Sequence, residues 1–380
     1  MRLPCQRDLF DIPDDVAYLN CGYMSPLMKR VREAAVDGLS RKAHPWEIVP
    51  DDFFTGSDAL RAIFARLINA RADDIAIVPA VSYGVSTAAR NLPLSTGQTV
   101  IVVEDQFPSN VYPWRERARE VGARVRTVPR PPGCRWTPAV LEAIDGDTAI
   151  VALPHCHWTD GGLLNLERIG DVCRDNGIGL ALDVTQSLGV LPLDVSRIQP
   201  DFLSCAAYKW LMGPYSIGFL YASKRWQNEG VPIEHNWIHR RNAEDFARLV
   251  DYQDDFEPGA RRFDVGERSN FALVPAAEAA IRQILEWGID NVRETIEELA
   301  DGIVERVAPL GLTALPKNLR APHYLGLQME AGLPPRLLPE LARRNVYASV
   351  RGDSIRVTPH VYNTPEDVDR FVQALTAVLA

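Results

Sequence analysis

The chain lacks the features that would place it in a membrane, on a nucleic acid or in an oxidising compartment. No run approaches the roughly 18 apolar residues that span a bilayer, and the N-terminal sequence MRLPCQRDLFDIPDD contains no signal-peptide core. The net charge of −9 argues against nucleic acid or an anionic membrane as a partner. Six scattered cysteines without CxxC spacing need not form disulfides. We therefore expect a cytoplasmic protein.

A second absence concerns the nicotinamide cofactors. A NAD-dependent oxidoreductase on a Rossmann sheet would need the sequence GxGxxG after its first strand and an acid about 20 residues later. The chain contains no such run, which disfavours this class of enzyme. It also shows no internal repeats and no low-complexity segment, and its 380 residues suffice for two or three compact units.

The middle of the chain alternates short β-rich runs with amphipathic helical stretches. Several runs are almost continuously apolar, as expected for parallel strands that are covered on both faces. This alternation predicts an α/β domain with a mostly parallel, seven-stranded sheet. The predicted strands are residues 75–78, 99–103, 124–128, 148–153, 179–183, 202–205 and 217–221, with helices at 109–121, 138–144 and 166–176 between them.

The pattern changes from about residue 255 onward. A long helical tract at 275–307 precedes strands at 323–329, 346–350 and 354–358, and a closing helix begins at Pro365 behind Thr364. We expect a large α/β domain over residues 16–255. Residues 1–15 and 256–380 are expected to form a smaller α+β domain, with 227–261 as a connection or excursion.

An acid ends one of the predicted strands. Ligands of open parallel sheets bind at the carboxyl ends of the strands, and Asp183 closes the apolar run 179–183. Pyridoxal phosphate (PLP) needs a carboxylate beside its pyridine nitrogen, because a protonated ring is the better electron sink. Gln186, three residues on, is placed to hydrogen-bond the phenolic oxygen of such a cofactor. Taken alone, however, an acid after a strand more often serves as a cap or turn former.

A lysine follows the next predicted strand. Loop lysines are usually solvated, but Trp210, Leu211 and Met212 would hold Lys209 in apolar surroundings. Desolvation lowers the pKa of a lysine and frees the neutral amine that a Schiff base requires. Lys209 is therefore the candidate cofactor anchor and catalytic residue.

The residues around this lysine carry a resemblance. Residues 208–221, YKWLMGPYSIGFLY, resemble the cofactor-lysine segment of the class V aminotransferase family of fold-type-I PLP enzymes. That family includes cysteine desulfurases, kynureninase and isopenicillin N epimerase-like proteins. Asp183 and Gln186 also fit its pattern, with Asp183 lying 26 residues before Lys209. The resemblance runs from about Tyr18 to the C-terminus and implies a fold-type-I enzyme with PLP as its cofactor and, as in most relatives, a homodimer.

The phosphate end of the cofactor is expected at the start of a helix. Ser82, Tyr83 and Gly84 follow the strand 75–78, and backbone N–H groups at a helix start favour a phosphate. An ordinary helix cap would explain Ser82 equally well. By resemblance the three residues occupy the cofactor-phosphate turn of the family, and Tyr208 is similar to the kynureninase tyrosine that touches the phosphate.

Three further cofactor contacts are implied by the resemblance. Phe107, in Phe-Pro-Ser, resembles the kynureninase pattern and is expected to stack on the pyridine face. Trp158 falls near the position where desulfurases carry an asparagine that contacts the cofactor. Ser269 aligns with a loop that reaches the phosphate of the neighbouring subunit, although the preceding Glu267-Arg268 departs from the family pattern.

The segment His155-Cys156-His157 raises the question of a metal. Alternate residues on a strand with a single nearby carboxylate do not make a closed zinc site, so no metal is expected. The resemblance places this segment at the rim of the active site.

The substrate of such an enzyme is a small-molecule amino acid, whose α-carboxylate requires a cation. Arginine offers bidentate geometry, and Arg356 stands in a stretch that resembles the carboxylate-binding arginine of the family with its Tyr-Asn-Thr helix lead-in. Cysteine desulfurases carry a loop cysteine near this arginine, whereas here no cysteine follows Cys205. Persulfide chemistry of that form is therefore not expected. An aminotransferase or a Cβ lyase (C–S or kynureninase-like), acting through an external aldimine, and an epimerase of the isopenicillin N type remain open.

Overall fold

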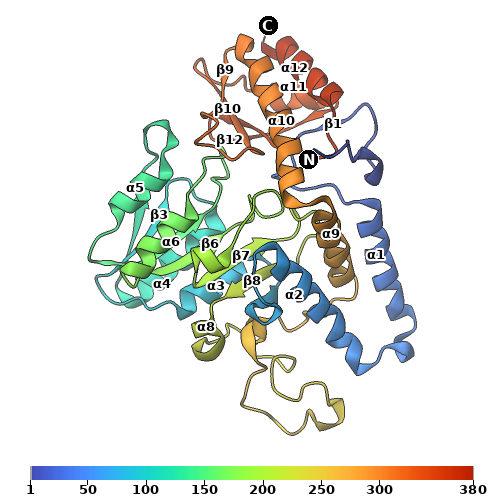
Figure 1. Ribbon diagram of the computed structural model, residues 1–380, viewed down its shortest axis with the longest axis vertical. Helices are drawn as coiled ribbons and strands as arrows, with labels where there is room; N and C mark the ends of the chain where they lie inside the picture. The colour runs from blue at the N-terminus through green and yellow to red at the C-terminus, as the bar shows by residue number, and fades with distance from the viewer. Residues whose placement is uncertain (1, 380) are drawn as a thin grey trace.

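The computed structural model describes residues 2–379, and its centre is a seven-stranded sheet in the order β2-β8-β7-β6-β5-β3-β4 (Figure 1). Strand β8 runs antiparallel to both of its neighbours, and the other pairs are parallel. The predicted mostly parallel sheet is confirmed. The strands are β2 (Ile75–Val78), β3 (Thr99–Val103), β4 (Arg124–Val128), β5 (Thr148–Pro154), β6 (Gly179–Asp183), β7 (Phe202–Ala206) and β8 (Gly218–Ala222).

Both faces of this sheet are buried, which explains the continuous apolar runs. Along β3, Ile101 and Val103 pack into one core, whereas Val100 and Val102 pack into the other. Such alternation is dictated by the two-residue period of a strand. Helices α3 (Val81–Asn91) and α4 (Tyr112–Val121) contribute to the second core, and α2 (Thr55–Leu67), α5 (Trp136–Ala143), α6 (Leu166–Asp175) and α9 (Leu273–Trp287) contribute to the first.

A second sheet is built from the C-terminal part of the chain. Its four antiparallel strands lie in the order β12-β13-β10-β9. They share a separate core with helices α10 (Ile289–Val307), α11 (Leu337–Ala342) and α12 (Pro365–Leu379), which stand together at the top of Figure 1. The strands are β9 (Leu312–Thr313), β10 (Leu325–Met329), β12 (Ser349–Arg351) and β13 (Ser354–Val357).

Two predictions for the C-terminal part need correction. The tract 275–307 is two helices, because the chain turns at Gly288 with φ 77° between α9 and α10. The single strand predicted at 346–350 is two strands: β11 (Val346–Tyr347) pairs with β1 (Ala17–Tyr18), and β12 joins the four-stranded sheet.

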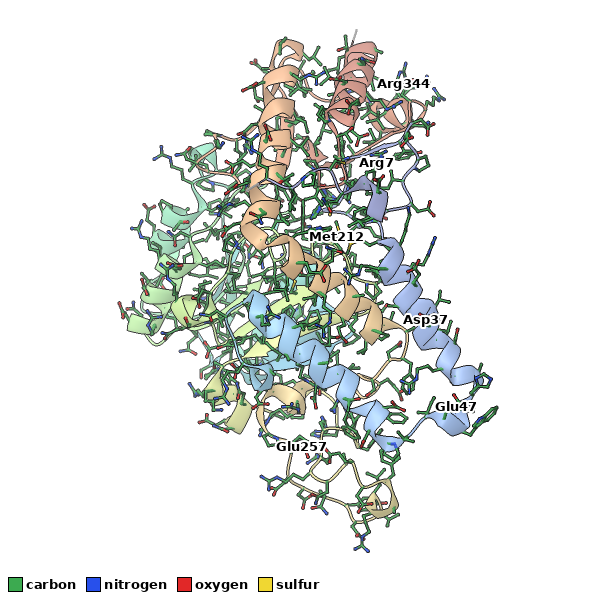
Figure 2. The ribbon with its side chains drawn as sticks, turned by 45° about the vertical axis from the view of Figure 1, so that its right-hand side comes forward. Arg7, Asp37, Glu47, Met212, Glu257 and Arg344 are labelled. Carbon is green, nitrogen blue, oxygen red and sulfur yellow. The ribbon has the colours of Figure 1, made fainter. Side chains whose placement is uncertain are left out.

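A helix near the N-terminus and a long loop at residues 230–258 lie outside the two sheets. Helix α1 (Lys29–Ser40) packs against α9, and neither α1 nor α2 follows from the sequence patterns above. Residues 230–258 form the expected excursion, a long loop that leaves the body at the end opposite α12; Figure 2 labels Glu257 there and Arg344 at the other end. Over residues 2–379, no helix combines the length and the apolar character needed to cross a bilayer.

Candidate active site

A cavity of about 260 Å³ opens at the carboxyl ends of the parallel strands. Pro154 ends β5, Asp183 ends β6 and Ala206 ends β7, and all three line the cavity. This is where an open parallel sheet binds ligands. Of the residues singled out from the sequence, the lining includes Ser82, Phe107, Trp158, Asp183, Gln186, Tyr208 and Lys209.

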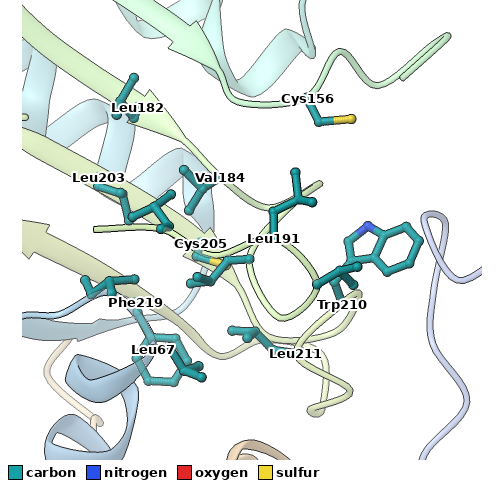
Figure 3. Packing of buried hydrophobic residues seen from close by; sticks show 14 of the residues in the cluster. Leu67, Cys156, Leu182, Val184, Leu191, Leu203, Cys205, Trp210, Leu211 and Phe219 are labelled. Carbon is teal, nitrogen blue, oxygen red and sulfur yellow. The ribbon is translucent and has the colours of Figure 1, made fainter. Parts of the chain in front are cut away.

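Lys209 lies in the loop between β7 and β8, with only 7% of its surface exposed. All five lysines of the sequence lie in the described part of the chain, and the other four are exposed. Trp210 and Leu211 anchor the loop in the core with Cys205 (Figure 3). Burial lowers the pKa of Lys209 to about 8, although the charge of Asp183 opposes this shift. The neutral amine is therefore accessible near physiological pH.

The backbone of the lysine loop is held in an unusual conformation. Met212 and Ser216 have φ values of 56° and 66°, in the left-handed region that non-glycine residues rarely adopt. The Ser25 N–H donates to the Tyr208 carbonyl at 3.0 Å, and the Gly213 N–H donates to the Ala207 carbonyl at 2.9 Å. Residues in this region persist only where their surroundings fix them, and such residues cluster at functional sites.

The carboxylate of Asp183 is available to a positively charged ring. The Thr185 N–H donates to its Oδ1 at 3.0 Å, and burial raises the pKa of this carboxyl. Within residues 2–379, no lysine or arginine reaches ion-pairing distance of it. An unpaired carboxylate on a cavity wall is costly unless a ligand compensates it. A protonated PLP pyridine fits this requirement.

Gln186 is fixed by two hydrogen bonds. The Trp210 indole N–H donates to its Oε1 at 2.9 Å, and its Nε2 donates to the Gly22 carbonyl at 3.0 Å. An amide nitrogen carries two hydrogens, so one N–H remains for a ligand oxygen. Trp210 thus fixes the side chain of Gln186, whereas the rings nearest the Lys209 amine are those of Phe107 and Tyr208.

The start of helix α3 offers a site for the phosphate group of the cofactor. Ala80 precedes the helix and lines the cavity with Val81 and Ser82, and a methyl group cannot accept hydrogen bonds from the first-turn N–H groups. The Tyr83 N–H donates to the Ala80 carbonyl at 3.1 Å, whereas the N–H groups of Val81 and Ser82 have no partner among residues 2–379 and are open to an anion. Asn110, also on the lining, has a buried Nδ2 with no partner among the described residues. Both observations fit a bound phosphate.

Tyr83 and Gly84 lie in α3 outside the lining of the cavity. Burial raises the pKa of the Tyr83 hydroxyl, which lies near Glu234. A Cβ on Gly84 would come within 2.3 Å of the Ser204 hydroxyl, so this glycine lets α3 approach β7 closely. Their roles as phosphate contacts stay predictions.

The aromatic wall consists of Phe107 and Trp158. Their rings meet edge to face with centroids 5.4 Å apart, and the Lys209 Nζ lies 5.3 Å from the Phe107 centroid. The Trp158 indole N–H donates to the Asp105 carbonyl at 2.5 Å. Phe107 is placed to cover a planar ring that is attached to the lysine.

The histidines of the His155-Cys156-His157 segment are occupied within the fold. The His155 ring bonds to the Ser187 hydroxyl at 3.0 Å, and His157 Nε2 bonds to the Glu104 carbonyl at 2.9 Å. Burial lowers the pKa of His155 to about 4 and also lowers that of His157. Each ring is therefore hydrogen-bonded to a group of the fold itself, as is typical of a histidine with a structural role.

Ser269 lies away from the cavity. Its hydroxyl donates to the Phe53 carbonyl of the same chain. A contact between Ser269 and the phosphate of a second subunit stays a prediction.

Arg356 comes from the second sheet, on β13, and is only 1% exposed. Its Nε donates to the Ser349 hydroxyl at 2.9 Å, and its Nη1 lies 3.5 Å from the Trp158 carbonyl. Nη2 is buried without a partner, and no carboxylate of residues 2–379 pairs with this guanidinium. Arg356 is not itself a lining residue, but Trp158, whose carbonyl it approaches, lines the cavity.

Two glycines allow the second sheet to approach the cavity wall. Gly326 pairs with Arg356 in the sheet, and a Cβ there would lie 2.5 Å from the Asp160 Cα. A Cβ on Gly161, whose φ is 82°, would lie 2.5 Å from the Tyr324 carbonyl oxygen. Backbone atoms cannot yield as side chains do, so these contacts require glycine.

Substitution of Gly326 by alanine is expected to push β10 and Asp160 apart. We expect the free energy of unfolding to fall by about 1–3 kcal/mol, as for an overpacked core, and carboxylate binding at Arg356 to weaken. Urea denaturation and ligand titration measure the two effects. The matched control is Gly302→Ala in α10, where an added Cβ meets nothing within 4 Å and helix propensity improves. Equal stabilities of Gly326→Ala and the native protein would refute this account of the junction.

Several residues of the cavity lining were not predicted from the sequence. Thr185, between the two residues predicted to bind the cofactor, orients Asp183. Tyr215, directly after Gly213-Pro214, packs against Tyr208 with ring centroids 4.6 Å apart. Both residues lie within segments already assigned to the site, between Asp183 and Gln186 and within residues 208–221, and this position could have identified them. The other lining residues that were not predicted include Gln106, Ser109, Asn110, Ser216 and Ile217, whereas Cys156 lines the cavity as the expected position of its segment at the rim implies.

Comparisons with known proteins agree with this geometry. The chain is 26% identical over 347 residues to the uncharacterized aminotransferase YcbU of Bacillus subtilis, covering 90% of this chain and 88% of the relative. It is also 26% identical to the isopenicillin N epimerase of Streptomyces clavuligerus, covering 84% and 83%. Its fold matches a structure of a C-DES mutant with glycine covalently linked to the PLP cofactor, with a TM-score of 0.88, 20% identity and coverage of 98% and 99%. The family model of aminotransferase class-V matches residues 51–371. The chain therefore belongs to the class V aminotransferase family of PLP-dependent, fold-type-I enzymes.

Proposed function

We propose that this PLP-dependent enzyme is an aminotransferase or a Cβ lyase that acts on an α-amino acid. Arg356 carries this proposal, because it is a buried guanidinium without a carboxylate partner among residues 2–379, and it approaches the carbonyl of Trp158 on the wall of the cavity that holds Lys209. An α-carboxylate supplies the missing charge in bidentate geometry.

Each residue of the site then has a distinct task. PLP supplies an electron sink for negative charge that develops at the substrate Cα. Asp183 holds a proton on the ring nitrogen, and the α3 start holds the phosphate. Arg356 orients the substrate through its carboxylate, and Lys209 moves the proton at Cα as a general base.

The lining favours proton transfer by a single base. Lys209 contributes the only amine among the lining residues that the structure describes. Burial raises the pKa of the Tyr208 hydroxyl to about 12 and that of the Cys156 thiol well above its usual value, so both stay protonated. Transamination and elimination need only one base, whereas inversion by a two-base route needs a second group that accepts protons. This supports the first two reactions over an epimerase.

The positions of the cysteines also bear on the type of reaction. No cysteine follows Cys205 in the sequence, and Cys156 is a buried, protonated thiol at the cavity wall. The thiolate is the nucleophilic form of cysteine. A persulfide on a cysteine of the arginine loop is therefore not part of this proposal.

The test is to incubate the purified holoenzyme with a panel of amino acids, with and without a keto acid. Keto-acid-dependent exchange of amino groups identifies an aminotransferase. Release of sulfide or another β-substituent without a keto acid, whether or not the α-amino group is also lost as ammonia, identifies a lyase. Inversion at Cα as the sole reaction, followed by chiral chromatography, would overturn the proposal.

A further inference from the structure

A second arginine stands beside Arg356 without an acidic partner. In the hairpin of β12 and β13, Ser349 pairs with Arg356, and Arg351 pairs with Ser354. Because side chains alternate along a strand, Arg351 and Arg356 project from the same face as diagonal neighbours, roughly 7–8 Å apart at Cα. Burial and the charge of Arg356 lower the pKa of Arg351, which agrees with their proximity.

Both guanidinium groups face the same residue of the cavity wall. The Arg351 guanidinium lies 5.7 Å from the Trp158 ring centroid, and the Arg356 Nη1 lies 3.5 Å from the Trp158 carbonyl. Both charges lower the pKa of Lys209. Trp158 lines the cavity that contains Lys209, so the two arginines lie beside the Trp158 wall of that cavity.

Arginines that are buried elsewhere in this protein have a carboxylate. Arg268 lies 3.0 Å from Asp264, which also pairs with Arg61, and Arg320 lies 2.9 Å from Asp301. Arg351, half-buried, donates from Nη1 to the Val350 carbonyl at 2.8 Å. A carbonyl carries no full charge, and no acid of residues 2–379 pairs with Arg351 or Arg356. The site thus has two positive charges to be neutralised by a ligand.

We infer that Arg356 and Arg351 together bind an α-amino acid whose side chain ends in a carboxylate, with Arg351 as the residue that determines this specificity. The inference rests on the proposed function, in which Arg356 holds the α-carboxylate. Arg351 then holds the second carboxylate, with its guanidinium positioned by the indole of Trp158. A substrate with a neutral side chain would leave Arg351 uncompensated.

Unreactive acids of equal carbon number test this inference without turnover. The holoenzyme is titrated calorimetrically with succinate against butyrate and with glutarate against valerate. We expect at least one dicarboxylate to bind about tenfold to hundredfold more tightly than its monocarboxylate, the contribution of a hydrogen bond to a charged group. Arg351→Gln should remove this preference, and Arg351→Lys should retain part of it.

The controls separate this inference from the function on which it rests. Arg343→Gln, at an exposed arginine paired with Glu340, should leave the preference intact. Arg356→Gln should weaken the binding of both classes of acid. If the native protein shows no preference, or if Arg351→Gln keeps it in a protein of unchanged melting temperature, the inference fails although the proposed function stands. If Arg356→Gln leaves both affinities unchanged, the proposed carboxylate site fails as well.

Discussion

Substitution of Lys209 by alanine is expected to lower kcat by about 10²- to 10⁴-fold, the usual contribution of a positioned proton-transfer group. It should also remove the covalent link to the cofactor, because the amine that forms the link is gone. Borohydride reduction of the native holoenzyme, followed by peptide mass analysis, should place the label on Lys209. The sequence has only five lysines, so the assignment is unambiguous.

Lys224→Ala is the matched control for this experiment. Lys224 is exposed at the start of α8 (Lys224–Glu229) and bonds only to the Gln227 side chain, at 3.5 Å. Its loss should leave kcat and the label unchanged. Incorporation of PLP into the native apoprotein should accelerate with rising pH through about 8, where Lys209 loses its proton. A label on any other lysine, or full activity of Lys209→Ala, would show that the anchor is misassigned.

The sequence predicted the central sheet well because its strands are short and apolar throughout. Four of the seven strands begin and end at the predicted residues, for example β3 and β6. Helices α1 and α2 escaped prediction, because their packing against α9 lies far away in the sequence. The break at Gly288 was hidden within a helical pattern that continues on both sides of it. The local apolar pattern therefore predicted the strands of the central sheet, but not the elements whose position depends on packing against distant parts of the chain.

The site residues that could be predicted are ionisable side chains at or shortly after the end of an apolar strand. Asp183 and Lys209 follow apolar runs, and both line the cavity. Arg351 could not be recognised in this way, because its proposed role depends on the pairing of β12 with β13 and on the approach of Trp158, which lies in the turn after β5. Gly326 and Gly161, which permit that approach, carry no reactive group and give no local signal of their function.

Asp183→Asn is expected to lower kcat by about 10²- to 10³-fold, the size observed when one electrostatic stabiliser of developing charge is removed. The amide keeps the shape of the side chain but cannot hold a proton on the ring nitrogen. A second readout concerns stability. Burial raises the pKa of Asp183 above its ordinary value, so its ionised form opposes folding of the apoprotein above that pKa. The apoprotein of the variant should therefore melt at the same or a higher temperature.

The holoenzyme should respond in the opposite direction. A ligand stabilises the fold according to its affinity, so the rise in melting temperature that PLP causes should shrink in Asp183→Asn. Asp194→Asn is the matched control, since Asp194 accepts an N–H from Ser196 at 2.8 Å just as Asp183 accepts one from Thr185 at 3.0 Å. It should leave the PLP-dependent rise unchanged. If Asp183→Asn instead destabilised the apoprotein and kept both activity and the PLP-dependent rise, Asp183 would be a turn residue. In that case the ring nitrogen would need another partner.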